Sequence, residues 1–361
     1  MADAFRGLCG RKYIDERVRR RTLCSKTERS ESEEASDSNC MAETLKEKYA
    51  PYFKVGVAFG TWDIEPKKDL ITTHFNSVTC ANEMKPSSLV RPNGEYNFGP
   101  ADQIVALAKE NNMAIHGHTY VWHNQTPKEF FENTTPEKLL DTLRSHVQKV
   151  KEHYGELATF DAVNEAIEDK SEEYLRDTPW RRVLGDDYIA TVFRVIKEIV
   201  PNTELYYNDY NDSFPEKREK ILRLLKSLIA EGVPISGMGL QSHYNIFTPD
   251  VDEVKRSIEA YAALGLKLRI SELDVSMYNH DIGEQISWPN PEYSKKQADF
   301  YGKLFKVYRE YAKHIDAVTF WGVADNDSWL NGFPVRGRRN YPLLFDDNKQ
   351  PKEAFYSVMD F

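Results

Sequence analysis

Eight short apolar segments alternate with amphipathic helical patterns from residue 52 to the end of the chain. Each apolar segment has the length and the β-branched or aromatic content of a buried strand. Strands that alternate with helices are typical of βαβ units, and eight such repeats indicate a parallel sheet that closes on itself. We therefore predict an α/β fold, a single (β/α)8 TIM barrel, with strands at residues 53–59, 77–80, 114–118, 158–163, 204–208, 237–242, 267–271 and 317–321.

Helical patterns fill most of the intervals between these segments. No Pro- or Ser-rich linker and no second folded module interrupt the pattern, and 361 residues suit one barrel. The main expected helices cover residues 102–110, 137–154, 187–199, 215–231, 251–264 and 295–313.

The first 40 residues differ in composition from the rest, being rich in charge and Ser with few apolar positions. We predict a disordered tail over residues 1–41 and a catalytic barrel over residues 42–361. The basic cluster at residues 17–21 has acidic neighbours, which favours a solvated tail over a targeting or nucleic-acid patch. Of the four cysteines, only Cys80 lies outside the tail, so a disulfide framework is not expected.

The charge balance limits the partners. The formal net charge is -9, from 57 acidic and 48 basic residues, which argues against nucleic acid or an anionic membrane as a partner. No apolar run has the length of a membrane helix, and the N-terminal segment lacks the apolar core of a secretory signal. We expect a cytoplasmic enzyme acting on a neutral substrate.

Two of the predicted strands deliver a glutamate at their C-terminal ends, Glu165 after residues 158–163 and Glu272 after residues 267–271. In (β/α)8 barrels the active site lies at this end of the strands. Cleavage of a glycosidic bond requires two carboxyl groups, one to protonate the leaving oxygen and one to attack the sugar carbon or activate water. The pair therefore predicts a glycosidase.

Polar or aromatic residues end most of the other strands. They include Asn82-Glu83-Met84-Lys85, His116-Gly117-His118, Trp122-His123, Asn208-Asp209, Gln241-Ser242-His243, Asp274, Trp321 and Trp329. In their order along the chain these motifs resemble glycoside hydrolase family 10, the retaining endo-β-1,4-xylanases, and particularly its intracellular bacterial members. The resemblance extends over roughly residues 45–361. His116 and Tyr120 depart from it, at positions where the family often has arginine and an aliphatic residue.

The resemblance implies roles for the central residues. Glu165 matches the general acid/base and Glu272 the nucleophile. Asp274 lies two residues beyond Glu272, on the same side of a strand, and His243 matches a histidine that bridges those two carboxylates. Asn164 matches the residue that binds the sugar 2-hydroxyl beside the scissile bond.

The resemblance also implies a sugar-binding cleft for xylan or xylo-oligosaccharides, with no cofactor and no metal. Gln241 is expected near the nucleophile, and Trp321 and Trp329 are expected as a hydrophobic floor and wall. Because xylose lacks the hydroxymethyl arm of glucose, a close aromatic wall would admit xylose and crowd glucose. The positions that match those holding the two sugars on the non-reducing side are Asn82, Glu83, Lys85, His118 and Trp122.

Three alternatives remain open at this point. The His116-x-His118 pair has the spacing of metal ligands in barrel hydrolases, with His123, His243 and Asp325 as further candidates. A non-catalytic sugar-binding protein would keep the tryptophans, but it would not require both glutamates. A β-1,4-glucanase on the same barrel is the nearest rival within the glycosidases.

Overall fold

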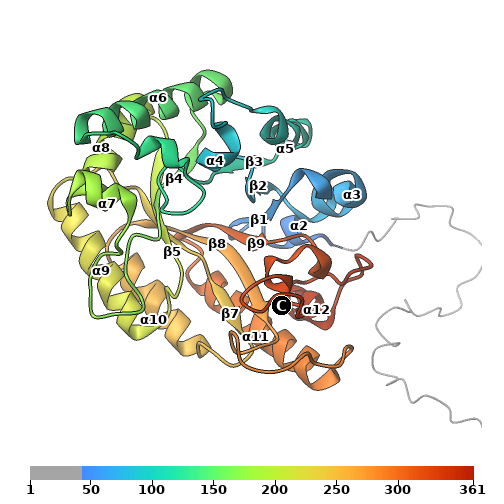
Figure 1. The fold of residues 1–361 in the computed structure, drawn as a ribbon. Coiled ribbons are helices and arrows are strands. Elements are labelled where there is room, and N and C mark those ends of the chain that lie inside the picture. The colour runs from blue at the N-terminus through green and yellow to red at the C-terminus, as the bar shows by residue number, and fades with distance from the viewer. Residues whose placement is uncertain (1–42) are drawn as a thin grey trace, which may run out of the picture. The chain divides into compact units, whose positions relative to one another are not determined.

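The computed structural model describes residues 43–361, in which eight parallel strands close into a barrel surrounded by helices (Figure 1). The strands pair in the order β6-β5-β4-β3-β2-β1-β9-β8, and pairing of β6 with β8 completes the ring. The predicted fold class is confirmed, whereas the predicted tail lies outside the described residues. The barrel strands are β1 (Lys54–Phe59), β2 (Ser77–Cys80), β3 (Ala114–Gly117), β4 (Thr159–Asn164), β5 (Glu204–Asp209), β6 (Gly237–Leu240), β8 (Lys267–Ser276) and β9 (Ile315–Trp321).

Each of the six predicted helices overlaps an observed one. In α6 the Thr135 side chain caps the first turn by accepting from the Lys138 amide, Pro136 occupies the first turn, and Gly155 ends the helix at φ 78°. The helices are α2 (Leu45–Lys48), α3 (Ile64–His74), α4 (Pro86–Leu89), α5 (Gly99–Glu110), α6 (Pro136–Tyr154), α7 (Pro179–Leu184), α8 (Tyr188–Ile199), α9 (Pro215–Ala230), α10 (Val251–Ala262), α11 (Pro291–Glu310) and α12 (Glu353–Met359).

The sixth predicted strand differs from the expectation, because residues 237–242 do not form one strand. The chain turns at Ser242, whose φ is 58°, and Asp212 holds the turn by accepting from the Ser242 amide at 2.9 Å. Beyond the turn, β7 (His243–Asn245) pairs only with the C-terminal part of β8, where His243 is aligned with Asp274. This pairing explains why β8 runs to Ser276, five residues past its predicted end.

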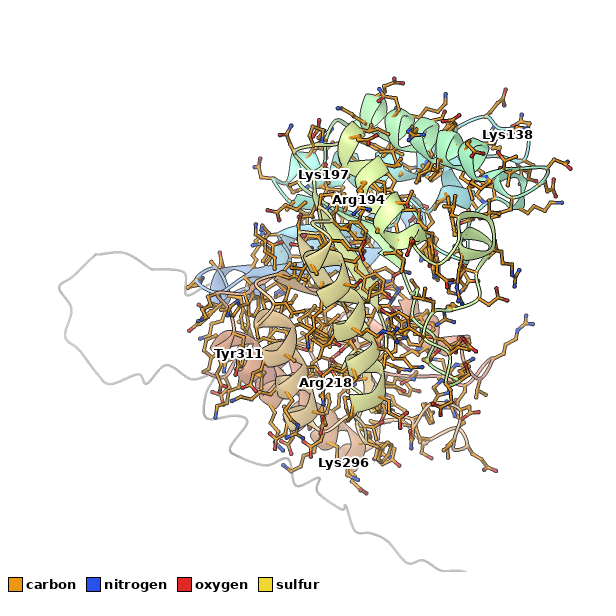
Figure 2. The ribbon with its side chains drawn as sticks, turned by 90° about the vertical axis from the view of Figure 1, so that its left-hand side faces the viewer. Lys138, Arg194, Lys197, Arg218, Lys296 and Tyr311 are labelled. Atoms are coloured by element: carbon orange, nitrogen blue, oxygen red, sulfur yellow. The ribbon has the colours of Figure 1, made fainter. Side chains whose placement is uncertain are left out.

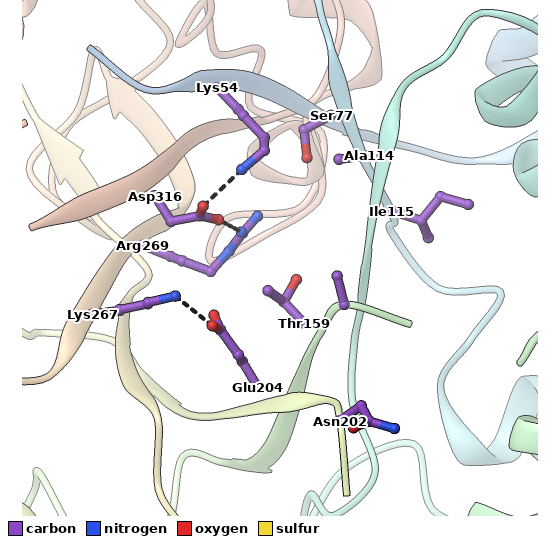
Figure 3. A pocket seen from close by; sticks show the side chains of 11 residues that line it. Lys54, Ser77, Ala114, Ile115, Thr159, Asn202, Glu204, Lys267, Arg269 and Asp316 are labelled. Atoms are coloured by element: carbon purple, nitrogen blue, oxygen red, sulfur yellow. Dashed lines mark hydrogen bonds and ion pairs between the residues drawn. The ribbon is translucent and has the colours of Figure 1, made fainter. Parts of the chain in front are cut away.

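A cluster of charged side chains closes the barrel at the N-terminal ends of the strands. A pocket of about 320 Å³ lies there. Figure 3 shows that Asp316 in this pocket pairs with both Lys54 and Arg269, and that Lys267 pairs with Glu204. Burial acts to raise the pKa of Asp316, but the charges of Arg269 and Lys54 outweigh it and lower the pKa. The Arg269 side chain is only 3% exposed, so its positive charge is buried, and Asp316 is its main counter-ion.

Replacing Asp316 with asparagine is expected to lower the free energy of unfolding by about 3 kcal/mol at pH 7, because Arg269 loses its counter-ion while remaining buried. A carboxyl group whose pKa is depressed on folding contributes its stability above the unfolded-state pKa and loses it as the pH falls. The difference in the free energy of unfolding between the parent protein and Asp316→Asn should therefore become smaller below about pH 4. Urea unfolding followed by tryptophan fluorescence measures both effects.

Asp299 provides the matched control for this experiment. Its ion pair with Lys295 has side chains that are 57% and 75% exposed, so Asp299→Asn should change the stability by less than about 0.5 kcal/mol. Equal losses in the two variants would contradict a structural role for the charged cluster.

The outer faces of the helices are polar. Figure 2 shows charged side chains such as Lys138, Arg194 and Lys296 projecting from the helical ring. Arg218 of α9 is instead largely covered and donates to Glu253 and Ser257 of α10, at 2.9 and 3.1 Å, which joins the two helices. Over residues 43–361, none of the helices combines the length and the hydropathy needed to cross a bilayer.

Candidate active site

A cleft of about 1130 Å³ lies at the C-terminal ends of the barrel strands. It brings together nearly all the residues that the sequence assigns to a site, although they come from seven different strands or the loops that follow them. Glu83 is the one predicted site residue that does not line this cleft. Those that line it are Asn82, Lys85, His118, Trp122, Asn164, Glu165, Gln241, His243, Glu272, Asp274, Trp321 and Trp329.

Glu272 lies within β8 with its carboxylate held by two donors. Asn208 donates to Oε1 at 2.8 Å, and Nε2 of His243 lies 3.0 Å from Oε2. Burial by itself would raise the pKa of Glu272, but the hydrogen bond from His243, the charge of His118 and the hydrogen bond from Asn208 together lower it. Glu272 is therefore ionised in the range where enzymes work.

His243 connects two carboxylates. Its Nδ1 lies 3.0 Å from Oδ2 of Asp274, and the same oxygen accepts from the Trp329 indole at 2.8 Å. Burial would lower the pKa of His243, but the adjacent Asp274 and Glu272 raise it to about 10. The ring is thus an imidazolium at neutral pH, and it supplies the positive charge that keeps Glu272 ionised.

Glu165 follows β4 with φ 57°, a left-handed conformation that turns its side chain into the cleft. Trp122 donates to Oε2 at 2.8 Å and Gln241 to Oε1 at 3.0 Å. Burial raises the pKa of Glu165, and the negative charges of Asp209 and Glu272 act in the same direction, against the hydrogen bonds from Gln241 and Trp122. The two glutamates therefore differ in the protonation state that their surroundings favour.

Asn208, at the end of β5, is a site residue that the sequence did not single out. Its amide nitrogen donates to Oδ1 of Asn164 at 2.9 Å as well as to Glu272. Its amide oxygen accepts from Ser271 at 2.6 Å, and a Cβ at Gly239 would lie 2.3 Å from that oxygen. The absent side chain of Gly239 leaves the room that Asn208 needs. The position of Asn208 at a strand end was the only sequence signal for it.

One end of the cleft is formed by residues that follow β2 and β3. Nζ of Lys85 lies 3.0 Å from both Asn82 Oδ1 and Gln125 Oε1, and 5.0 Å from the centre of a Trp122 ring. Glu83 is turned away, because its carboxylate accepts from the backbone amides of Asn82 and Thr61, each at 3.1 Å. Its contacts organise two loops, and its predicted contact with sugar stays a prediction.

Aromatic rings form the walls. Trp321 lies edge-on to His118 with ring centres 5.5 Å apart, and Trp329 lies 5.0 Å from the His243 ring. Phe333, which the sequence interpretation did not include, stacks on Trp329 at 5.2 Å and is half exposed. These rings surround the carboxylates with flat apolar surface suited to a sugar.

His116 and His118, the two histidines of the metal alternative, both contact one aspartate. Nδ1 of His118 and Nε2 of His116 both contact the Asp161 carboxylate, at 2.8 and 3.1 Å. Asp325 pairs with Lys352 at 2.9 Å. Across residues 43–361, no group of three or more His, Cys, Asp or Glu side chains has an arrangement that would hold a metal ion.

On the other side of Glu165, Arg176 joins the loop after β4 to the end of β5. Its guanidinium donates to the backbone oxygen of Glu165 at 3.0 Å, to the Tyr210 hydroxyl at 2.7 Å and to Asp169 at 3.2 Å. Arg176 was not predicted, and its position in an irregular loop carries no periodic signal that would have indicated it. Both Arg176 and Tyr210 line the cleft.

Comparison with known proteins identifies the family. The sequence model described as Glycosyl hydrolase family 10 matches residues 44–361. The chain belongs to glycosyl hydrolase family 10. The resemblance noted from the motifs is thereby confirmed, and this family 10 member is a glycoside hydrolase.

The relatives of this family 10 chain cover almost all of the described part. Endo-1,4-beta-xylanase B of Paenibacillus barcinonensis is 42% identical, covering 88% of this chain and 97% of the relative. Endo-1,4-beta-xylanase A of Caldicellulosiruptor saccharolyticus is 41% identical, and the match covers 88% of this chain and 96% of the relative. The crystal structure of an endo-1,4-beta-xylanase from Caldicellulosiruptor owensensis has a TM-score of 0.85 at 43% identity, and the match covers 88% of this chain and 99% of that structure's chain.

Proposed function

We propose that the protein is a retaining endo-1,4-β-xylanase in which Glu272 is the nucleophile and Glu165 the general acid/base. The observation that carries this proposal is the opposite electrostatic environment of the two carboxyl groups. An imidazolium and an amide donor favour the charged form of Glu272, whereas burial and a neighbouring carboxylate favour the protonated form of Glu165. The names of the curated relatives support the choice of xylan as substrate.

The reaction would take place in two displacements. In the first, the Glu272 carboxylate forms a bond to the anomeric carbon, the glycosidic C–O bond breaks, and the Glu165 proton moves to the leaving oxygen. In the second, Glu165 takes a proton from water, the water oxygen bonds to the anomeric carbon, and the ester to Glu272 breaks. Both glutamates end in their starting protonation states.

Asn164 and Asn208 would position the sugar and the nucleophile relative to each other. Oδ1 of Asn164 accepts from Asn208 at 2.9 Å and from Gln241 at 3.2 Å, which fixes the orientation of its amide. Its nitrogen then faces the cleft, 3.4 Å from Glu165. From this place Asn164 can donate to the sugar 2-hydroxyl, a contact that strengthens in the transition state of glycosidases.

Substrate binding on the non-reducing side is assigned to the cleft end formed by Asn82, Lys85, His118 and Trp122. Trp321 and Trp329 would lie close to the C5 position of a bound sugar, where xylose carries no hydroxymethyl group. The same walls would crowd glucose. On this basis we propose xylan or xylo-oligosaccharides as the substrate in preference to β-1,4-glucans.

The test combines stereochemistry with substrate choice. The full chain is incubated with xylohexaose and cellohexaose, and proton NMR records which anomer is released first. We expect cleavage of internal bonds of xylohexaose with the β-anomer appearing before mutarotation. First release of the α-anomer would reject the retaining mechanism, and equal kcat/KM on aryl xylobioside and aryl cellobioside would reject the xylose preference. Sugar binding without any cleavage would favour the non-catalytic alternative.

A further inference from the structure

Trp62 is a tryptophan of the cleft wall to which the proposed function gives no role. It lies in the short 3-10 helix Thr61–Asp63 that follows β1, it lines the cleft, and it is 62% exposed. Isolated exposed apolar residues are common on protein surfaces. An exposed indole inside a sugar-binding cleft requires a closer examination of how it is held.

The indole is supported from below by the backbone. A Cβ placed on Gly60 would lie 2.4 Å from Cη2 of Trp62 and within 2.6 Å of two further carbons of the same ring. The six-membered ring therefore occupies the space that a side chain at position 60 would take. With Gly60 on one side and 62% of the residue still exposed, the ring presents flat apolar surface to the cleft.

The loop that carries Trp62 is held in place by buried charged groups. The Thr61 amide donates to Glu83 at 3.1 Å, and the Gly60 amide donates to Asp63 at 3.2 Å. Asp63 pairs with Lys67 at 2.9 Å, in an ion pair whose two side chains are 5% or less exposed. Because the backbone on both sides of Trp62 is anchored, ordering of this loop costs little when a ligand binds.

A series of contacts connects Glu165 to the loop that carries Trp62. Trp122 donates to Glu165 and lies under the ammonium group of Lys85, which in turn donates to Asn82 at 3.0 Å. Asn82 and the loop of Trp62 are joined by Glu83, which accepts from the amides of both Asn82 and Thr61. The loop of Trp62 is thus joined through Glu83 to the part of the cleft that Asn82 and Lys85 line.

We propose that Trp62 forms a third sugar-binding subsite on the non-reducing side, by stacking on the apolar face of a pyranose ring. This inference rests on the proposed function, which assigns the first two sugars on that side to Lys85, Asn82 and their neighbours. The subsite would use apolar contact and shape, so it would take a neutral sugar. It would favour longer xylo-oligosaccharides over short ones.

The experiment compares two aryl glycosides that differ by one sugar. Nitrophenyl xylobioside fills two subsites before the scissile bond, and nitrophenyl xylotrioside fills three. In the parent protein kcat/KM for nitrophenol release should be higher for the trioside. Trp62→Ala should lower the trioside value by roughly 3- to 10-fold and leave the bioside value within 2-fold, as expected for the loss of one aromatic contact. Trp62→Phe should retain most of the trioside advantage.

Tyr356 provides a matched control, because it is an aromatic residue of α12 that is 60% exposed and does not line the cleft. Tyr356→Ala should leave both substrates unchanged. If Trp62→Ala changes kcat/KM equally for the two substrates, or for neither, the third subsite is rejected. Activity of the parent protein on the bioside would still support the proposed function in that case. A parent protein that cleaves neither aryl xyloside would reject the proposed function and the subsite together.

Discussion

Glu272→Ala is expected to lower kcat on aryl xylobiosides by roughly 10⁵-fold or more, the scale on which removal of an enzyme nucleophile acts. No other described group takes its place, because the second carboxylate near His243, that of Asp274, is already engaged by His243 and Trp329. Steady-state hydrolysis with an activated leaving group measures the residual rate. KM should change much less than kcat, since few sugar contacts are lost.

Chemical rescue separates a nucleophile from a residue that only shapes the cleft. Azide added to Glu272→Ala should restore turnover and yield the α-glycosyl azide, because the small anion enters from the side that the carboxylate leaves empty. As a control, Glu219→Ala on the exposed surface of α9 should retain full activity and need no rescue. Recovery of β-glycosyl azide from the Glu272 variant, or retention of more than a few per cent of activity, would contradict the assignment.

The second large effect is expected from Glu165→Ala, and its size should depend on the leaving group. Removal of a general acid typically costs 10²- to 10⁴-fold, so aryl glycosides with poor leaving groups and xylohexaose should lose about that much. A dinitrophenyl leaving group needs no protonation, and its release should show a burst followed by slow hydrolysis of the glycosyl ester. Azide should then give the β-glycosyl azide, with the configuration of the substrate.

The pH dependence of activity is an independent test of the roles of Glu165 and Glu272. Because burial raises the pKa of Glu165, its proton is retained to higher pH, and activity should fall on the basic side as that proton leaves. On the acidic side activity should fall as Glu272, whose pKa is lowered, becomes protonated. Glu165→Ala should remove the basic limb and keep the acidic one. An unchanged basic limb would assign that ionisation to another group.

Local sequence features were sufficient to predict the barrel and the two glutamates. Residues 158–163 and 267–271 have the short length and the apolar residues expected of strands, so they could be recognised without knowledge of their neighbours. In a parallel barrel all strand ends meet at one rim. The location of a glutamate at the end of such a segment therefore follows from the fold, and the six expected helices between the strands support the same fold.

The turn at Ser242 was not predictable in this way. Its conformation depends on Asp212, thirty residues earlier in the chain, which accepts from the Ser242 amide. Only that turn allows β7 to leave β6 and bring His243 beside Asp274 and Glu272. The periodicity of residues 237–242 is compatible with one continuous strand, which is why the prediction was wrong there.

The sequence by itself thus determined the fold class and the family and predicted which two carboxyl groups act, because each depends on residue patterns that are local or ordered along the chain. The tertiary structure decided how those groups differ. The contact of Asn208 with Glu272 and the contact of Glu83 with the Thr61 amide both depend on side-chain directions. Such directions are set by packing between segments far apart in sequence, which no local pattern encodes.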